Sequence, residues 1–291
     1  MYKGKKVLVT GSSGFVGSRL ANELLKNHAE VIRLDLAEGF DITEWSQIST
    51  IPKFDIAFHL AARSYVPDSY QNPRNFYYTN VVGTVNILEL CRLKNARMVF
   101  ASSYVYGIPE YLPIDEQHPV KGVNPYAQSK IVCEKLCEGY NRDSGVRVVV
   151  IRPSNIYGPG QTRNFLIPTI INQIESGIIN LRDSRPKRDL IFIDDVIEFY
   201  IKAGLYTDKS YDIFNCGSGN SFSIREIVDQ ILRLVTLKAD VNYLESDRKI
   251  EIMDSQYNIA KSEKMLKWKP RISMENGLTK ILENDFHPKT N

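Results

Sequence analysis

The stretch Thr10-Gly-Ser-Ser-Gly-Phe-Val-Gly17, near the start of the chain, decides the fold. It follows a short apolar segment, Val7–Thr10, that is typical of a buried strand. It leads directly into residues 14–27, whose apolar residues have helical spacing. Glycines spaced G-x-x-G-x-x-G between a strand and a helix predict a turn that binds the phosphates of a dinucleotide.

Each glycine of this turn has its own expected role. Gly11 permits the tight turn, Gly14 lets the backbone approach a pyrophosphate, and Gly17 lets the helix pack closely on the sheet. The N-terminus of the helix, at Phe15 and Val16, offers free N–H groups and a positive dipole end to the phosphates. We therefore expect all five residues to contact the cofactor.

The end of the second predicted strand, Glu30–Leu34, carries a carboxylate, Asp35. A carboxylate at this place would accept hydrogen bonds from both adenosine ribose hydroxyls and would repel a 2′-phosphate. This favours NAD over NADP as the cofactor, although the nearby Arg33 weakens the inference. We expect Asp41 and Ile42, which follow after a very short connection, to lie near the adenine.

The first half of the chain alternates strands and helices, which predicts a doubly wound parallel sheet, the α/β fold of the Rossmann type. Further strands are expected at Ile56–Leu60, Arg97–Ala101 and Val146–Ile151, and further helices at 72–93 and 124–142.

After Arg152 the regular alternation of strands and helices ends. We expect helices at 165–176, 194–205, 223–235, 259–266 and 274–282, with strands at 189–193 and 213–216. The dinucleotide-binding domain is therefore predicted to comprise residues 1–152 and to receive about 189–217. A smaller, discontinuous α/β lobe, residues 153–188 and 218–291, is predicted to bind the substrate.

Composition excludes several classes of protein. The 291 residues are 43% hydrophobic, enough for a sizeable core and too many for a disordered or fibrous chain. A net charge of +3 gives no reason to expect a nucleic acid or a membrane surface as partner. No apolar run is long enough for a membrane span or a signal peptide, so we expect a cytoplasmic protein. The four cysteines show no metal-binding spacing, so we expect reduced, structural thiols and no metal site.

A tyrosine and a lysine lie four residues apart in the predicted helix 124–142, in Tyr126-Ala-Gln-Ser-Lys130. This spacing places the phenol and the ammonium on one helix face. We expect the ammonium and the positive nicotinamide of NAD⁺ to lower the pKa of Tyr126. Tyr126 could then exchange a proton with a sugar hydroxyl while a hydride moves to or from the nicotinamide, whose ribose Lys130 would hold. Ser102, at the end of a predicted strand, could hydrogen-bond the same substrate oxygen.

Seven segments with recognisable motifs follow one another along nearly the whole chain. The segments are Thr10–Gly17, His59–Ala62, Asn80, Ala101–Gly107, Pro125–Lys130, Arg152–Gly160 and Arg188–Asp195. Together they make the chain resemble the extended short-chain dehydrogenase/reductases, in particular the NAD-dependent epimerase/dehydratase family acting on nucleotide sugars.

The resemblance implies a role for each matching residue. Tyr126 would be the acid/base, Lys130 its partner and Ser102 the hydroxyl that polarises the substrate oxygen. On the cofactor side, Leu60, Ala61 and Ala62 would line the dinucleotide, Pro153 would lie against the nicotinamide, and Asn80 would support the active-site backbone or a structural water. On the side of a nucleoside-diphosphate sugar, Arg188 and Arg248 would bind the diphosphate, and Asn155 would touch the sugar or its phosphate. Three further residues are expected at the sugar from their place after predicted strands, with packing as the alternative, namely Arg63, Ser103 and Tyr104.

Three reactions share this scaffold. Dehydratases of the family carry an acidic residue before the Val-Tyr-Gly sequence, where this chain has Tyr104, so elimination is disfavoured. Asp35 favours a 4-epimerase, which oxidises C4, turns the keto-sugar and returns the hydride to its other face. The short segment from Asp35 to Phe54 favours instead a 4-keto-6-deoxy-sugar reductase, as do Trp268-Lys-Pro270 and Gly158-Pro-Gly-Gln161. A non-catalytic scaffold that senses the dinucleotide is the remaining alternative.

Relatives often dimerise through the helices that correspond to 72–93 and 124–142. We therefore expect a homodimer whose contact includes apolar residues on both helices, namely Ile87, Leu88, Cys91, Cys133 and Cys137.

Overall fold

The computed structural model of the chain describes residues 1–162, 164–235, 238–244 and 251–286. Its largest element is a six-stranded sheet in the order β2-β1-β3-β4-β5-β9, with every neighbouring pair parallel. The strands are β1 Lys6–Thr10, β2 Glu30–Leu34, β3 Ile56–His59, β4 Arg97–Ala101, β5 Val148–Pro153 and β9 Tyr211–Cys216. The predicted doubly wound parallel sheet is therefore confirmed.

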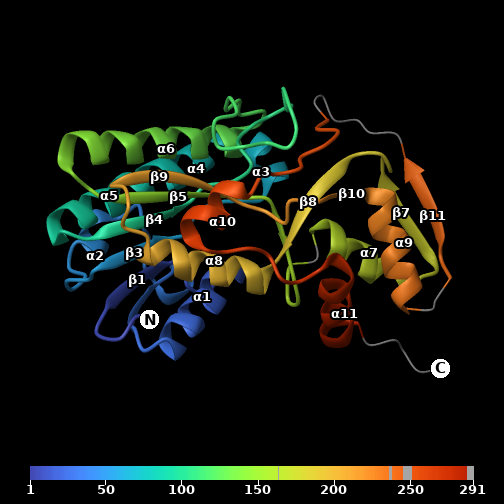
Figure 1. The fold of residues 1–291 in the computed structure, drawn as a ribbon, viewed down its shortest axis with the longest axis horizontal. Coiled ribbons are helices and arrows are strands. Elements are labelled where there is room, and N and C mark those ends of the chain that lie inside the picture. Colours follow the sequence, from blue (N-terminus) through green and yellow to red (C-terminus); the bar gives the residue numbers. More distant parts are fainter. Residues whose placement is uncertain (163, 236–237, 245–250, 287–291) are drawn as a thin grey trace.

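Helices cover both faces of this sheet (Figure 1). Helices α1 (Phe15–Lys26) and α8 (Ile193–Leu205) pack together on one face, and α5 (Gly83–Lys94) and α6 (Pro125–Ser144) on the other. Strands β3 and β4 are buried almost throughout, as their continuous apolar character predicts. The core therefore consists of two layers, one on each side of the sheet.

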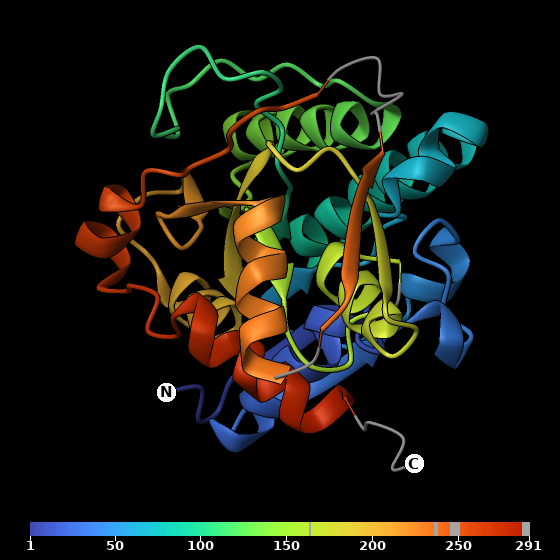
Figure 2. The ribbon, with the colours of Figure 1, turned by 90° about the vertical axis from the view of Figure 1, so that its right-hand side faces the viewer.

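The smaller lobe lies at one end of the molecule (Figure 1). It contains a three-stranded sheet in the order β10-β8-β6, and a parallel pair of β7 and β11. In Figure 2 this lobe faces the viewer, with α9 standing in front, coloured orange. The elements are β6 Asn155–Tyr157, α7 Leu166–Ile174, β7 Ile178–Arg182, β8 Lys187–Phe192, β10 Ser221–Ser223, α9 Ile224–Val235, β11 Asp240–Leu244 and α11 Met274–Asp285.

The segment 189–217 divides between the two parts. Its helix α8 and strand β9 join the large sheet, as the sequence predicts, whereas β8 belongs to the small sheet. Helix α10 (Ala260–Leu266) contacts β9. The capping box of α9 is present, since Ser223 N donates to Glu226 Oε2 at 2.7 Å and Glu226 N donates to Ser223 Oγ at 3.1 Å.

The helix predicted at 72–93 is interrupted. The segment consists of α4 (Pro73–Tyr77), a π-helical turn η2 (Tyr78–Val82) and α5, and a separate short helix, α3 (Val66–Gln71), precedes it. The π-helical turn buries Asn80, which is 2% exposed, beside the active-site backbone described below. The prediction missed this irregularity because regular helical spacing does not show where a π-helical turn places a polar side chain in a buried position.

The five apolar residues expected at a dimer contact lie inside the protein instead. Ile87, Leu88, Cys91, Cys133 and Cys137 are all 0% exposed and pack in the core between the sheet and the helices α5 and α6. That part of the prediction is wrong, because the apolar faces of both helices pack against the sheet. All four cysteines are buried free thiols.

Among the described residues, the protein has no helix of the length and apolarity needed to cross a membrane.

Candidate functional site

A cavity of about 870 Å³ opens along the carboxyl ends of the large sheet and continues into the smaller lobe. Such a crevice is where open parallel sheets bind ligands. All described site candidates from the sequence line it except Asn80: Gly11, Gly14, Phe15, Val16, Gly17, Asp35, Asp41, Ile42, Leu60, Ala61, Ala62, Arg63, Ser102, Ser103, Tyr104, Tyr126, Lys130, Pro153, Asn155 and Arg188. Arg248 lies outside the described residues.

The turn between β1 and α1 has no room for a side chain at Gly11 or Gly17. Gly11 has φ +70°, and a Cβ there would lie 2.8 Å from the amide nitrogen of Ala61. A Cβ on Gly17 would overlap the carbonyl oxygen of Gly11. The backbone is therefore open toward the cavity and packed tightly behind, so the turn fits a dinucleotide pyrophosphate at the start of α1.

Asp35 connects this turn to the end of β2. Its Oδ2 accepts from Ser13 N at 3.0 Å, and its Oδ1 accepts from Ala37 N at 2.9 Å. Arg33, in contrast, donates to Asn22 Oδ1 on α1 at 2.7 Å and does not line the cavity. The guanidinium that weakened the inference of NAD is thus directed elsewhere.

The residues expected near the adenine lie beyond Asp35. Asp41 Oδ1 accepts from both the backbone nitrogen and the hydroxyl of Thr43, at 2.8 Å each. The carbonyl of Ile42 accepts from Asn86 Nδ2 at 2.9 Å. These bonds fix the loop that borders this end of the cavity.

Behind the cavity wall runs a buried chain of hydrogen bonds. The backbone nitrogen of Ala61 donates to Thr10 Oγ1 at 3.1 Å, and Thr10 Oγ1 lies 2.8 Å from His59 Nδ1. His59 Nε2 lies 3.1 Å from the hydroxyl of Thr84, which itself donates to Asn80 O. Burial lowers the pKa of His59 to about 3, with a further contribution from Lys130, so the ring is neutral and structural.

Asn80 supports the cavity wall from outside it. Its Oδ1 accepts from Arg63 N at 2.8 Å, and its Nδ2 donates to Arg63 O at 3.1 Å and to Ser129 Oγ at 2.9 Å. The structure therefore places Asn80 in the backbone-supporting position, away from the space available to a cofactor.

Tyr126 and Lys130 lie at the start of α6, with both side chains on the cavity. Asn124 caps this helix by accepting from Ala127 N at 2.8 Å, which fixes the turn that carries Tyr126. Lys130 Nζ donates to Ala101 O at 2.7 Å, and burial lowers the pKa of Lys130 to about 8.

The pKa of Tyr126 differs from the sequence-based expectation. Burial raises it to about 12, and a hydrogen bond with the Ser103 side chain opposes this rise. Desolvation thus outweighs any effect of a nearby ammonium, so in the protein alone the phenol is the favoured form.

The two serines after β4 have different partners. Ser102 Oγ donates to Glu134 Oε1 at 2.5 Å, whereas Ser103 Oγ donates to Tyr104 O at 3.4 Å. Tyr104 stacks on Tyr257, with ring centroids 6.2 Å apart, and donates its hydroxyl to Gly107 O at 2.7 Å.

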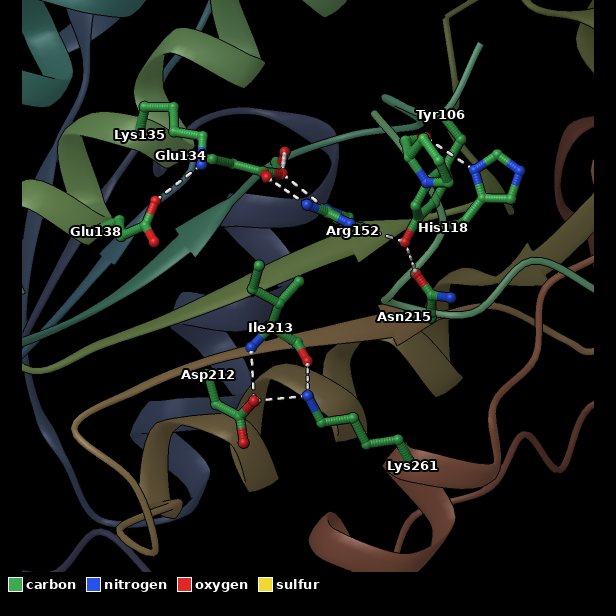
Figure 3. A network of polar contacts seen from close by, with 12 residues as sticks. Tyr106, His118, Glu134, Lys135, Glu138, Arg152, Asp212, Ile213, Asn215 and Lys261 are labelled. Carbon is green, nitrogen blue, oxygen red and sulfur yellow. Dashed lines mark hydrogen bonds and ion pairs between the residues drawn. The ribbon is translucent and has the colours of Figure 1, made fainter. Parts of the chain in front are cut away.

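A buried ionic network, missed in the sequence, supports this region (Figure 3). Arg152 donates to both carboxylate oxygens of Glu134, from Nε at 3.0 Å and from Nη2 at 2.6 Å. Its Nη1 donates to the Tyr106 hydroxyl at 3.2 Å, which donates to Asn215 Oδ1 at 2.5 Å. Glu134 lies one helical turn beyond Lys130, and this i, i+4 spacing is the signal that could have drawn attention to it.

At the other end of the cavity, Arg188 forms an ion pair with Glu251 at 2.6 Å and donates to Ile252 O at 2.6 Å. Asn155 is exposed at the start of β6. Lining residues that the sequence did not single out come from segments distant in the chain and include Thr79, Thr162, Tyr200, Ile252 and Ser255. Only the folded arrangement brings these residues together.

Comparison with known proteins agrees with this geometry. A family model described as the NAD dependent epimerase/dehydratase family matches residues 7–217. The chain belongs to this family. As a member of the epimerase/dehydratase family it is an enzyme, and the resemblance seen in its motifs is confirmed.

Two curated relatives represent different reactions within the epimerase/dehydratase family. The chain is 32% identical to a putative UDP-glucose 4-epimerase of Methanocaldococcus jannaschii, over 95% of this chain and 97% of the relative. It is 28% identical to the GDP-6-deoxy-D-mannose reductase of Pseudomonas aeruginosa, over 96% and 97%. Among solved structures, RMD from Pseudomonas aeruginosa complexed with NADPH has a TM-score of 0.88 and 28% identity, covering 96% of this chain and 98% of that one.

Proposed function

We propose that the protein is an NAD-dependent 4-epimerase of nucleoside-diphosphate sugars. The observation that carries the proposal is a single cavity that extends from the glycine turn, past Tyr126 and Lys130, to Arg188. A dinucleotide at the turn and a diphosphate at Arg188 would bring the nicotinamide and the sugar together beside the phenol. The similarity to a putative UDP-glucose 4-epimerase supports the same assignment.

The chain's own residues account for binding and proton transfer. When bound, NAD would accept the hydride from C4 of the sugar and return it to the opposite face. Tyr126, as phenolate, takes the proton of the C4 hydroxyl as that hydride leaves, and gives it back when the C4–H bond forms again. Lys130 lies on the same face of α6 and would hold the nicotinamide ribose, while Pro153 would lie against the nicotinamide.

The sugar side is proposed from the same geometry. Arg188 would bind the diphosphate, for which a guanidinium offers a forked pair of donors. Asn155, Arg63 and Tyr104 line the cavity near the expected sugar. Arg248 keeps its predicted role as a second diphosphate ligand.

A reductase of 4-keto-6-deoxy nucleotide sugars is the second candidate. The similarity to a GDP-6-deoxy-D-mannose reductase and to the NADPH complex of RMD favours it. Asp35 lines the cavity and Arg33 lies outside it, and both observations favour NAD and hence the epimerase. Elimination of water is disfavoured because Tyr104 supplies no carboxylate.

The deciding experiment is to denature the purified protein and identify the nucleotide it releases by mass spectrometry. One NAD per chain, retained through purification, together with interconversion of a UDP- or GDP-hexose pair, would support the epimerase. A nucleotide-free protein that oxidises added NADH or NADPH with a 4-keto-6-deoxy nucleotide sugar would replace it with the reductase. A biological activity that Tyr126→Phe leaves unchanged would favour the non-catalytic scaffold that senses the dinucleotide.

The homodimer stays part of the proposal, without the contact residues first expected. Light scattering at working concentration tests it, and a mass of one chain would contradict it.

A further inference from the structure

Tyr200, on α8, is a buried tyrosine of the cavity wall to which no role has yet been assigned. It is only 1% exposed, yet it lines the cavity together with Tyr126. Two side-chain oxygens of the described residues are sealed from solvent without a hydrogen-bond partner, Ser12 Oγ and Gln230 Oε1. The Tyr200 oxygen has no partner among the described residues either, but it is not sealed, so the small exposed part of this side chain is its hydroxyl at the cavity. A buried polar group without a partner in the protein points to a ligand.

The direction of α8 explains how Tyr200 reaches the cavity. The last turn of α8 lies at the amino end of the sheet, where Arg97 at the start of β4 donates to Gly204 O at 2.7 Å. Side chains of a helix lean toward its N-terminus, which for α8 is the direction of the carboxyl ends of the strands. The ring of Tyr200 lies 6.4 Å from that of Phe58, near the end of β3. Tyr200 therefore enters the cavity from the face of the sheet that α1 and α8 cover (Figure 1).

The wall around this hydroxyl is apolar. Val16, Leu60 and Ala101 line the cavity and pack against the core cluster that contains Tyr200. Tyr126 approaches from α6, on the other face of the sheet. A nicotinamide ring between these two faces would meet apolar side chains and one hydroxyl on the α8 side. The carboxamide is the polar substituent of that ring, so it is the group that a lone hydroxyl in an apolar wall suits.

The Tyr200 hydroxyl is available as a donor. Burial raises the pKa of this phenol well above its ordinary value, so the hydroxyl keeps its hydrogen at neutral pH. Because no described residue accepts that hydrogen, it can be donated to a bound molecule without breaking a bond within the protein.

We propose that the Tyr200 hydroxyl donates a hydrogen bond to the carboxamide oxygen of the bound nicotinamide and thereby fixes which face of the ring is turned toward the sugar. The inference rests on the proposed function, because it assigns a binding residue within the same site. A nicotinamide can turn about the bond to its ribose, and a partner for the carboxamide on the α8 side favours one of the two orientations. No covalent bond forms or breaks at Tyr200.

The test compares the binding of NAD with that of ADP-ribose, which lacks the nicotinamide. The two nucleotides compete for the protein, and native mass spectrometry of the mixture gives the ratio of their dissociation constants, whether or not the protein is purified with NAD. Tyr200→Phe removes only the hydroxyl. It should lower the preference for NAD over ADP-ribose about three- to tenfold, the effect of one neutral hydrogen bond. An unchanged preference would overturn the proposal.

Tyr2→Phe is the matched control. The ring of Tyr2 lies 6.5 Å from the same Phe58 ring, but its hydroxyl donates to Ile201 O at 2.8 Å and Tyr2 does not line the cavity. With ADP-ribose bound, Tyr2→Phe should lower the melting temperature by a few degrees and leave the preference for NAD unchanged. Tyr200→Phe should do the reverse, because its hydroxyl has no partner to lose among the described residues. A reduced preference for NAD in both variants would contradict a specific role of Tyr200.

Thionicotinamide adenine dinucleotide tests which atom accepts the hydrogen bond. In this analogue a sulfur atom, a weak acceptor, replaces the carboxamide oxygen. The preference for the analogue over ADP-ribose should therefore change by less than about twofold in Tyr200→Phe. A loss as large as that found with NAD would overturn the assignment to the carboxamide oxygen.

These measurements also separate the inference from the proposed function, because they require no turnover. If the wild-type protein interconverts no nucleotide sugar, the proposed function fails, and the competition assay still decides the role of Tyr200. If Tyr200→Phe weakens the binding of UDP-glucose relative to UDP and leaves the preference for NAD unchanged, the hydroxyl serves the sugar and the present assignment falls.

Discussion

Arg188 and Glu251 form an ion pair of 2.6 Å at the end of the cavity opposite the glycine turn. Each side chain is largely buried, with 16% and 17% exposed. A diphosphate that binds Arg188 must therefore compete with a carboxylate already in place. If Arg188 binds the diphosphate as proposed, the strength of that binding depends on competition between the diphosphate and the Glu251 carboxylate.

Removing the charge of Glu251 should shift this balance. Glu251→Gln is expected to tighten the binding of UDP or GDP about three- to tenfold, because the carboxylate no longer competes for Arg188. Arg188→Ala should weaken the same binding about ten- to hundredfold. Isothermal titration calorimetry measures both, and the affinity for NAD serves as the control, since it depends on the other end of the cavity. Weaker diphosphate binding by Glu251→Gln would contradict this view of the pair.

The preference for NAD should depend on Asp35. Asp35→Asn removes the charge that repels a 2′-phosphate, so we expect the ratio of the dissociation constants of NADP and NAD to fall about tenfold or more. Fluorescence titration with NADH and NADPH gives this ratio. Arg33→Ala is the matched control, because Arg33 is bonded to Asn22 outside the cavity and should leave the ratio within about twofold of wild type.

Tyr126→Phe should abolish turnover while the site remains formed. The expected loss in kcat is about 10²- to 10⁴-fold, the usual contribution of a general acid or base. The ring keeps its edge-on contact with Phe76, at 6.4 Å between centroids, so NAD and UDP should bind as in wild type. Loss of both binding and turnover would instead indicate that the substitution disturbs the fold.

Lys130 should reduce stability at neutral pH. Burial lowers its pKa from 10.5 to about 8, so between these values the unfolded chain binds the proton more strongly than the folded protein does. Stability therefore rises with pH across this window, and the cost of burying the charge is fully present below pH 8. Relative to wild type, Lys130→Met should be most stable near pH 7 and should lose up to about 3 kcal/mol of that advantage by pH 10.5. Urea unfolding at several pH values tests this, and a constant difference would argue against a charged, buried Lys130.

Much of the large sheet could be predicted because its signals are local. The strands Glu30–Leu34 and Arg97–Ala101 have the bounds expected from their apolar runs. The glycine turn is recognisable because only glycine fits at positions 11 and 17, where a Cβ would collide with neighbouring backbone atoms.

The remainder depends on contacts between distant segments. The apolar face that carries Cys133 suits a core and an interface equally, and only the packed sheet decides between them. The sequence likewise identifies Ser102 as a hydroxyl beside the site, but its partner Glu134 and the arginine that fixes Glu134 lie on different elements. The direction of a hydroxyl hydrogen is thus a property of the assembled network.

The position of β9 at the edge of the sheet has a consequence for synthesis of the chain. Its neighbour β5 ends at Pro153, but β9 begins only at Tyr211, after the chain has entered the smaller lobe and returned. A ribosome therefore releases β5 long before the strand that covers its edge, and an unpaired strand edge invites association with other chains. Nascent chains stopped before residue 216 should accordingly be the ones that require a chaperone, whereas chains that include β9 can close the sheet.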